Sequence, residues 1–368
     1  MKSKGKILLG MSGGLDSSVT AALLKEQGYE CIGVYMNLWA DPVVFDLEDR
    51  KKFPQNKCCS IGSLMFARSI CQKLGMPFYS INFEETFKGA VVDFFLEGFK
   101  EGETPNPCVR CNKTVKFGEL FKKMEELGCD YLATGHYAKL ITDEEGEVHL
   151  HRGKDAAKDQ TYFLYNLSQD KLKKIKFPLG DFTKPEVREL AKKFGLTELE
   201  NKRESQGVCF YPEKTYVEFL KRHLKPGKDF KPGKIKDATG KEVGEHQGLP
   251  FYTVGQRKGI GVGGGPALFV NKMDTIKNVL IVGKEEDILS TEIPVRDFNF
   301  LSGKAPEEDE IFDARVRSLG HFSKARLIKT EAGTKVHFLQ PERAVMPGQS
   351  VVLYRGTELV GGGIMCYN

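Results

Sequence analysis

The chain has 368 residues, enough for two or three domains, and a hydrophobic content of 40%, which suffices for ordinary cores. Its net charge of +5 is mildly basic and neither requires nor excludes a nucleic-acid partner. No apolar run approaches transmembrane length, and residues 1–5 lead into a strand without a signal sequence, so we expect a soluble, cytoplasmic protein with no membrane partner.

The first expected strand, 6–11, runs directly into the loop SGGLDSS at residues 12–18. Two glycines allow the backbone to approach a bound anion, and the helix that follows points unpaired N–H groups at it. The serines add hydroxyl donors, and Asp16 is a candidate ligand for Mg²⁺. The loop therefore predicts a phosphate site, although it lacks the spacing and the lysine of the common P-loop. The segment 10–14 also fits the G-x-S-x-G nucleophile elbow of hydrolases, or a plain glycine-rich turn.

Strand and helix patterns alternate from residue 6 to about residue 200, which predicts a doubly wound α/β domain. Such a domain has a parallel sheet and binds ligands at the carboxyl ends of its strands. The expected strands are 6–11, 31–38, 77–83 and 130–134, and the expected helices are 17–27, 60–74, 84–100 and 117–127. Thr183 and Glu186 then form a capping box for a helix that ends near Phe194.

The pattern changes after about residue 210, where one more helix, 211–225, precedes short β-type runs separated by glycines. This change indicates a small central domain and a C-terminal β-barrel or sandwich. We expect domains at 1–205, 206–285 and 286–368. The expected strands are 251–254, 267–270, 279–282, 311–316, 335–338, 350–354 and 359–364.

Nine cysteines in a chain without a secretion signal favour thiol or metal chemistry over structural disulfides. Cys108 and Cys111 follow a proline-stiffened turn, and Cys209 lies where the α/β pattern ends. A persulfide relay would need only Cys111 and Cys209, whereas an iron–sulfur cluster would use all three cysteines. A zinc site would need a fourth ligand such as Cys58 or Cys59, and plain buried thiols are the remaining interpretation. Four cysteines are expected to be core or incidental residues: Cys31, Cys71, Cys129 and Cys366.

Segments through nearly the whole chain resemble the tRNA-specific 2-thiouridylases (the MnmA/TrmU family). They are 12–18, 104–117, 133–137, 158–164, 207–210, 244–248, 253–259, 347–350 and 361–364. The resemblance implies an ATP-pyrophosphatase domain, a central domain and a C-terminal β-barrel. It also implies sulfur insertion at C2 of the wobble uridine in the tRNAs for lysine, glutamate and glutamine. ATP and Mg²⁺ would be required, with sulfur supplied by a cysteine desulfurase or a persulfide relay protein.

The resemblance also assigns roles to residues of this chain. It places the ATP phosphates at Gly10, Met11, Ser12, Gly13, Gly14, Leu15, Asp16 and Ser17, and the nucleoside at Met36 and Gly135. It places the target base at Asn106, Pro107 and Cys108, and makes Cys111 the nucleophile and Cys209 the persulfide carrier. It implies tRNA contacts at His136, Lys158, Asp159, Gln160, Gln349 and the pair Leu319–Gly320. From the residues alone, the alternative interpretation of His136 is a hydrogen-bonded structural histidine, and that of Lys158–Asp159 is a solvated charge pair.

Two positions depart from the family pattern. Cys108 stands where better-known bacterial members carry an aspartate, and it completes a three-cysteine set that related thiolases use to hold a [4Fe–4S] cluster. A cluster bound by Cys108, Cys111 and Cys209 is therefore an alternative carrier of the sulfur. Leu319 and Gly320 stand where many members have an Arg-Tyr pair that contacts tRNA, and Arg315, Arg317 or His321 are candidate replacements.

Two other functions remain open at this level. An adenylating synthetase of the same loop family that forms an amide would not need Cys111 or Cys209. A tRNA-binding module with a decayed ATP site is a non-enzymatic alternative, and the intact SGGLDSS loop argues against it.

Overall fold

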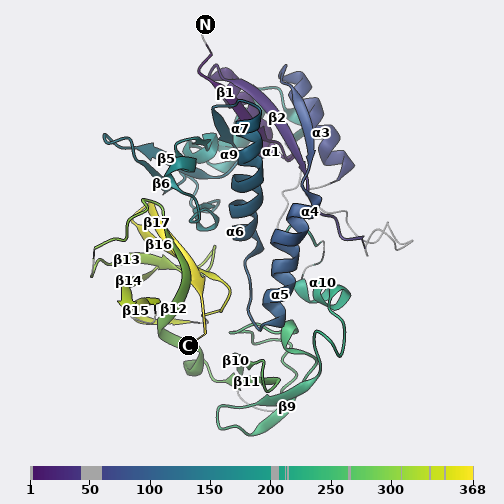
Figure 1. Cartoon of the computed structure of the whole chain (residues 1–368), viewed down its shortest axis with the longest axis vertical. Coiled ribbons are helices and arrows are strands. Elements are labelled where there is room, and N and C mark those ends of the chain that lie inside the picture. Colours follow the sequence, from purple (N-terminus) through teal and green to yellow (C-terminus); the bar gives the residue numbers. More distant parts are fainter. Residues whose placement is uncertain are drawn as a thin grey trace.

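The structure is a computed structural model that describes residues 3–42, 60–199, 207–211, 213, 215–263, 267–307, 309–330, 333–343 and 345–367. It has three parts, with the α/β domain at the top of Figure 1, the central domain at the bottom and the C-terminal barrel beside both. Among the described residues, no helix is long and apolar enough to cross a membrane.

The N-terminal domain is built on a five-stranded sheet in the order β3-β2-β1-β4-β7, in which every described pairing is parallel. Its strands are β1 Lys6–Gly10, β2 Glu30–Asn37, β3 Phe78–Asn82, β4 Tyr131–Ala133 and β7 Ile175–Lys176. The predicted doubly wound sheet is thus confirmed. Because β2 and β4 lie on opposite sides of β1, the strand order reverses at β1 and β4, and their carboxyl ends form the expected ligand crevice.

Helices cover both faces of this sheet. On β1, Ile7 and Leu9 point to one face and Leu8 to the other, as the two-residue period of a strand requires. The first face packs against α1 Leu15–Glu26, α3 Ile61–Lys73 and α9 Lys184–Lys193. The second face packs against two long helical stretches, which consist of α4 Glu84–Phe87, η1 Lys88–Asp93 and α5 Phe94–Lys100, and of α6 Pro107–Cys111, η2 Asn112–Glu119 and α7 Leu120–Glu126. Both η1 and η2 are π-helical, and each continues its neighbours without a break.

The start of the second long stretch corrects the sequence prediction. The helix expected at 117–127 begins instead at Pro107, because Asn106 caps it by accepting hydrogen bonds from the backbone N–H groups of Cys108 and Val109. Asparagine at the N-cap followed by proline at the first helical position is a recognised helix start. The change is important for function because it places Cys108 and Cys111 on a helix instead of in a loop.

The central domain contains a four-stranded sheet in the order β10-β11-β8-β9. Its strands are β8 Gly233–Lys236, β9 Glu242–His246, β10 Phe269–Asp274 and β11 Val279–Gly283. The helix expected at 211–225 is shorter, α10 Tyr216–His223, and the strand expected at 251–254 is wrong. That segment begins with the 3₁₀ turn η6 Leu249–Phe251, because Pro250 lacks the N–H that a strand would need. Short elements elsewhere are η3 Thr161–Phe163, α8 Gln169–Leu172, η4 Pro178–Asp181, η5 Thr197–Leu199 and η7 Glu286–Ile288.

The C-terminal domain is a β-barrel, as predicted. Its strands follow the order β12-β15-β14-β13-β16-β17, and a further pairing of β12 with β17 closes the ring. They are β12 Leu289–Phe300, β13 Phe312–Arg315, β14 Ser323–Thr330, β15 Gly333–Arg343, β16 Ser350–Arg355 and β17 Glu358–Met365. Apolar side chains fill the interior, among them Ile293, Phe312 and Phe338.

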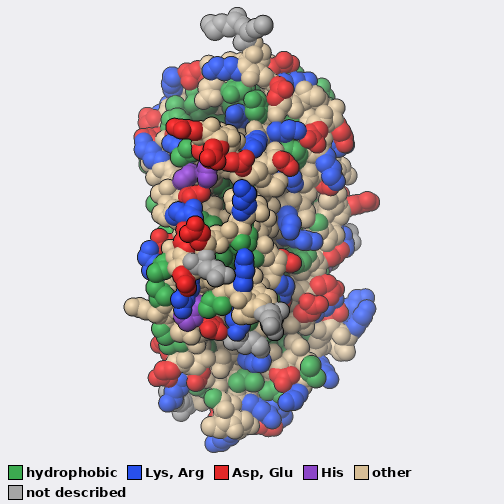
Figure 2. Space-filling model, turned by 60° about the vertical axis from the view of Figure 1, so that its left-hand side comes forward, with side chains coloured by type: hydrophobic (Ala, Val, Ile, Leu, Met, Phe, Trp, Pro, Cys, Tyr) green, Lys and Arg blue, Asp and Glu red, His purple; other side chains and the backbone are tan. Residues whose placement is uncertain are grey.

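One face of the molecule has a mixed charge distribution. Figure 2 shows Lys and Arg side chains interspersed with Asp and Glu, so the positive charge does not form one continuous patch on that face.

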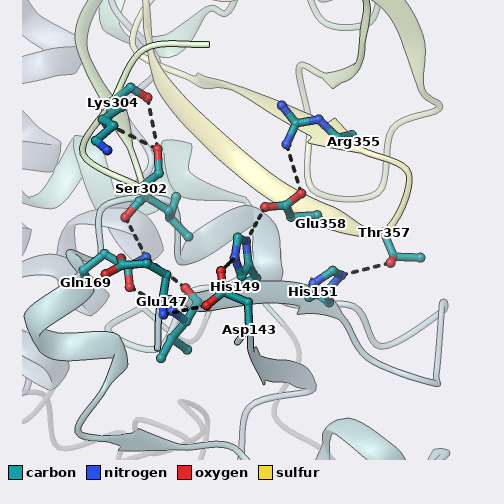
Figure 3. Close-up of polar contacts among 12 residues, drawn as sticks. Asp143, Glu147, His149, His151, Gln169, Ser302, Lys304, Arg355, Thr357 and Glu358 are labelled. Atoms are coloured by element: carbon teal, nitrogen blue, oxygen red, sulfur yellow. Dashed lines mark hydrogen bonds and ion pairs between the residues drawn. The ribbon is translucent and has the colours of Figure 1, made fainter. Parts of the chain in front are cut away.

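A hairpin of the N-terminal domain joins the barrel sheet, which the sequence did not predict. It consists of β5 Ala138–Thr142 and β6 Val148–Arg152, and β6 pairs with β17. Polar contacts reinforce the junction (Figure 3). His149 lies between Asp143 at 2.9 Å and Glu358 at 2.7 Å, and Arg355 reaches Glu358 at 3.1 Å.

This junction should make stability depend on pH. Hydrogen bonds to Asp143 and Glu358 raise the pKa of His149 above 6.5, so its contribution is full below pH 6.5 and is lost as pH rises through the raised value. Burial alone would raise the pKa of Glu358, but hydrogen bonds from His149 and Arg355 lower it below 4.5. Its contribution is present above pH 4.5 and is lost as pH falls through the lowered pKa.

We therefore expect His149→Gln to lower the melting temperature more at pH 6 than at pH 8.5. Thermal unfolding of the wild type and the variant across this pH range measures the difference. His337→Gln is the control, because His337 lies 3.5 Å from the half-buried Glu292 and belongs to β15, which pairs with β12 and β14 and not with the hairpin. A loss of stability that is equal at both pH values would contradict the assignment to His149.

Candidate active site

The loop after β1 has a backbone that only glycine accommodates at one point. Gly13 has a φ of +69°, and a Cβ atom there would lie 2.3 Å from the backbone oxygen of Ser63. Gly14, at a φ of −93°, is the N-cap of α1, and no side chain caps this helix end. The N-terminus of α1 therefore has the open, close-approach geometry that suits a phosphate group.

The loop serines have different positions. Ser17 and Ser18 are buried, and the Ser18 hydroxyl donates to the Gly14 oxygen at 2.9 Å, so these two fix the shape of the loop. The backbone N–H of Ser12 donates to the Ser17 hydroxyl at 3.2 Å. Ser12 itself is exposed at the mouth of the crevice, which leaves it the serine best placed to meet a ligand.

Asp16 is held by two groups that the sequence did not single out. The Tyr137 hydroxyl donates to Asp16 Oδ1 at 2.8 Å, and Lys184 Nζ lies 2.8 and 2.9 Å from the two carboxylate oxygens. Gly135 packs closely beside this point, since a Cβ atom there would be 3.1 Å from the Asp16 carbonyl carbon. Mg²⁺ at a nucleotide is commonly held by one or two carboxylates together with phosphates, so Asp16 fits as a single protein ligand that also pairs with Lys184.

A cavity of about 330 Å³ extends from this loop and contains all three cysteines of interest. Met11 and Ser12 line it at the end of β1, and Met36 lines it from β2. Cys108 and Cys111 reach it from α6, and Cys209 from the 207–210 segment. The remaining lining residues are Tyr35, Leu38, Phe87, Val91, Pro107, Lys116, Gln160, Gly207, Val208 and Phe210. The structure thus brings the predicted phosphate loop and the predicted nucleophiles to one space.

Two separate segments of the chain position the three cysteines. Cys108 and Cys111 share one face of α6, as a spacing of three residues dictates, with Cys111 buried and Cys108 half-buried. Cys209 is half-buried and precedes Phe210, which is fully buried against Phe95 and Phe219 at ring-centroid distances of 5.3 and 5.2 Å. The aromatic anchor fixes the backbone on one side of Cys209 while its thiol faces the cavity.

Tyr211 is a neighbour of these thiols that sequence reasoning missed. Burial, followed by the charges of Cys108 and other neighbours including Cys209, raises the pKa of Tyr211 to about 12. It is therefore a neutral phenol at physiological pH. In the sequence alone, the position of Tyr211 two residues after Cys209 does not indicate that it lies beside the cysteines of the cavity.

The cysteines do not form a ready metal site. Within the described ranges, no group of three or more His, Cys, Asp or Glu side chains is placed so that it could hold a metal ion. Cys108, Cys111 and Cys209 share a cavity but are not grouped around one metal position, and their role as ligands of an iron–sulfur cluster stays a prediction. Cys58 and Cys59, the proposed additional zinc ligands, lie outside the described residues. Cys31, Cys71 and Cys129 are buried in the core as expected, and Cys366 is half-buried.

The predicted tRNA-contact residues are not equally accessible. His136 is buried beside Phe117 and Phe177, and it shares a 2.7 Å hydrogen bond with Thr134. Burial, with a smaller effect of Lys116, lowers the pKa of His136 well below 6.5, so the ring is neutral. Its role in tRNA contact stays a prediction, and a contact would require a change in its surroundings.

Asp159 is also buried, and its Oδ2 lies 3.2 Å from Arg152 and 3.0 Å from Arg315. Arg315 is therefore committed to an internal ion pair rather than exposed as a replacement for the missing Arg-Tyr pair. Four other predicted contacts are accessible, with Lys158, Gln160 and Gln349 half-buried and Leu319 85% exposed. Gln349 donates to the Thr104 oxygen at 2.7 Å, which places it next to the turn before α6. Gly320 adjoins Leu319 in the same turn.

Comparisons with known proteins agree with this architecture. The chain matches family models described as the tRNA methyl transferase HUP domain at residues 5–213, the tRNA methyl transferase PRC-barrel domain at 217–284 and the aminomethyltransferase beta-barrel domain at 290–365. The limits of 1–205, 206–285 and 286–368 stay predictions.

Curated relatives match over almost the whole chain. The tRNA-specific 2-thiouridylase MnmA 1 of Caldanaerobacter subterraneus subsp. tengcongensis is 45% identical, covering 99% of each chain. The MnmA enzymes of Clostridioides difficile and Carboxydothermus hydrogenoformans are 43% and 44% identical, covering 98% and 97% of this chain and 98% and 96% of theirs. The three family models together match residues 5–213, 217–284 and 290–365. The chain therefore belongs to the family of tRNA-specific 2-thiouridylases.

Proposed function

We propose that this protein uses ATP to replace the C2 oxygen of the wobble uridine with sulfur in the tRNAs for lysine, glutamate and glutamine, in the cytoplasm. The observation that supports this most directly is the single cavity that joins Met11 and Ser12 of the phosphate loop to Cys108, Cys111 and Cys209. An amide-forming synthetase would not need two cysteines at that point.

The first step is activation of the uridine. A carbonyl oxygen is a poor leaving group, and its attack on the α-phosphorus of ATP converts it to an adenylate while pyrophosphate departs. The N-terminus of α1 and the loop N–H groups stabilise the phosphate charge. Mg²⁺, when bound, neutralises charge on the departing pyrophosphate, and Asp16 would hold it. Met36 and Gly135 are the residues proposed to contact the nucleoside.

The second step is sulfur transfer through a persulfide on Cys209, loaded by a cysteine desulfurase or a relay protein. The Cys111 thiolate attacks the inner sulfur of the persulfide, forming a Cys111–Cys209 disulfide and releasing hydrosulfide. Hydrosulfide then attacks C2 and displaces AMP, leaving the thiocarbonyl. An external thiol must reduce the disulfide before the next turnover. Lys116, which lines the cavity, supplies a positive charge where these anions develop.

The test is sulfur transfer by iron-free protein. Protein purified without oxygen and carrying a persulfide on Cys209 is mixed with ATP and unmodified lysine tRNA, and 2-thiouridine is measured by mass spectrometry. We expect one 2-thiouridine per persulfide without added iron. The matched sample is protein reconstituted with iron and supplied with sulfide.

Each outcome is decisive. Thiolation by iron-free protein supports the persulfide route. Thiolation only after reconstitution would instead make Cys108, Cys111 and Cys209 cluster ligands, and would mean that they rearrange from the positions described above. No thiolation by either sample, with pyrophosphate release also absent, would overturn the proposed function.

A further inference from the structure

A second, smaller cavity lies against the same helix as the cysteines. It has a volume of about 130 Å³, and α6 contributes Val109 and Arg110 to its lining, with Asn106 before the helix and Lys113 after it. Pro107, Cys108 and Cys111 line the larger cavity instead. The helix therefore separates the two cavities, with thiols on one face and two cations on the other. The other lining residues come mainly from Tyr165–Asn166 and from the barrel segments that contain Arg296, Asp297 and Ser350.

Arg110 is held in place without a carboxylate partner. Its Nε donates to the Ala90 oxygen at 3.1 Å, and its guanidinium carbon lies 5.0 Å from the centre of the Phe94 ring. In the part of the chain that the structure describes, neither of its terminal nitrogens has a hydrogen-bond partner and no ion pair involves it. A guanidinium that is fixed through Nε presents its two remaining nitrogens for bidentate binding of an oxyanion.

Lys113, one helical turn further on, is exposed and likewise has no ion-pair partner among the described residues. Arg296 also lines the cavity, but Glu103 neutralises it through contacts of 2.6 and 2.7 Å. Asp297 is the one carboxylate in the lining. Arg110 and Lys113 against Asp297 leave a surplus of one positive charge, which matches a singly charged phosphodiester better than a nucleoside triphosphate.

We propose that Arg110 and Lys113 bind one backbone phosphodiester of the tRNA, next to the nucleotide that carries the target uridine. This inference rests on the proposed function. A helix with its side chains is about 10–12 Å across. An RNA strand whose base enters the cysteine cavity can therefore pass around the start of α6 and bring a neighbouring phosphate to the second cavity. Gln349 lies near this end of the helix, because its side chain donates a hydrogen bond to the oxygen of Thr104, just before α6. Phosphate contacts of this kind fix the register of the strand and carry no sequence information.

The experiment measures tRNA affinity against salt. The dissociation constant of unmodified lysine tRNA is determined from 50 to 300 mM KCl for the wild type, Arg110→Gln, Lys113→Gln and the double variant. Each lost phosphate contact should reduce the slope of log affinity against log salt by about 0.7, the value for single strands. Because both residues are assigned to one phosphate, we expect the double variant to lose about 0.7 in slope, and each single variant, which keeps one cation at that phosphate, to lose less. Affinity should fall about tenfold at low salt.

Two controls separate this site from general charge effects. Lys122→Gln removes the same charge from the same long helical stretch, where Lys122 is paired with Glu119 at 2.8 Å, and should leave the slope unchanged. ATP affinity should be unchanged in all variants. If Arg110→Gln fails to fold, Lys113→Gln and Arg110→Lys decide the question, since the lysine keeps the charge but loses the bidentate contact.

The outcomes distinguish the two proposals. Wild-type protein that binds and thiolates tRNA, with variants of unchanged affinity and slope, would overturn the phosphodiester site and leave the proposed function standing. A slope loss of about 1.4 in the double variant, the value for two separate phosphates, would overturn the assignment to a single phosphate. Wild-type protein that does not bind tRNA would overturn the proposed function, and this site with it.

Discussion

Replacing Cys209 with serine is expected to abolish formation of 2-thiouridine, with a loss of at least about a thousandfold, while ATP-dependent release of pyrophosphate continues. Serine fills nearly the same space and keeps the packing of Phe210 against Phe95, but an alcohol cannot carry a persulfide. Cys111→Ser should block release of sulfur after the persulfide has formed. The two variants should therefore differ in persulfide content, which mass spectrometry of the loaded proteins measures directly.

Cys366→Ser is the matched control for these variants. Cys366 is half-buried like Cys209, but it lies just after β17 and outside the cavity of about 330 Å³. The Cys366→Ser variant should therefore retain wild-type activity. Cys108→Ser tests the remaining thiol of the cavity, and near-normal activity there would agree with a two-cysteine mechanism. Full thiolation by Cys209→Ser would rule out Cys209 as the sulfur carrier.

A single methyl group in the phosphate loop should have the second largest effect. Gly13→Ala is expected to weaken ATP binding by at least about a hundredfold, because the new Cβ would lie 2.3 Å from the Ser63 oxygen and the backbone has a φ of +69°. Strain of this kind costs about 1–3 kcal/mol, and relieving it must move the loop away from α3. Isothermal titration with ATP, together with the melting temperature of the ATP-free protein, measures the effect.

Gly14→Ala gives the comparison. Gly14 has an ordinary φ of −93°, and a Cβ atom there meets only the Ser12 hydroxyl at 3.3 Å, which rotation of that side chain can relieve. We expect a small loss of affinity, less than about tenfold. Equal losses in the two alanine variants would mean that the φ of Gly13 does not control ATP binding.

The parts of the fold that depend on local signals were predictable. The apolar run at 6–11 and the glycine loop predicted β1 and, to within two residues, the start of α1, and the Thr183–Glu186 capping box located α9. The pairing of the β5–β6 hairpin with the barrel was not predictable, because its partner β17 lies more than 200 residues away in the sequence, where no local pattern can indicate it. The start at Pro107 was not predictable from the Asn-Pro signal alone, because that pair is typical of a turn as well as of a helix N-terminus.

In the candidate site, too, local motifs were predictable from the sequence and contacts between distant segments were not. Sequence reasoning identified the phosphate loop from its motif, and the three cysteines that share its cavity from their setting in the chain and the family resemblance. It did not predict Lys184 and Tyr137 on Asp16, because these residues reach it from different elements. Nor did it predict that Asp159 would be buried between Arg152 and Arg315, since a charged pair looks the same in the sequence whether it lies inside or outside.

The hairpin that joins the barrel sheet also has a consequence for synthesis on the ribosome. His149 and its partner Glu358 are separated by 209 positions, so the hairpin leaves the ribosome long before the strand that completes its contacts. At about 5–20 residues per second, the interval is roughly 10–40 seconds. During that time the nascent N-terminal domain exposes an unpaired edge strand, which a chaperone is suited to shield until the last strand emerges.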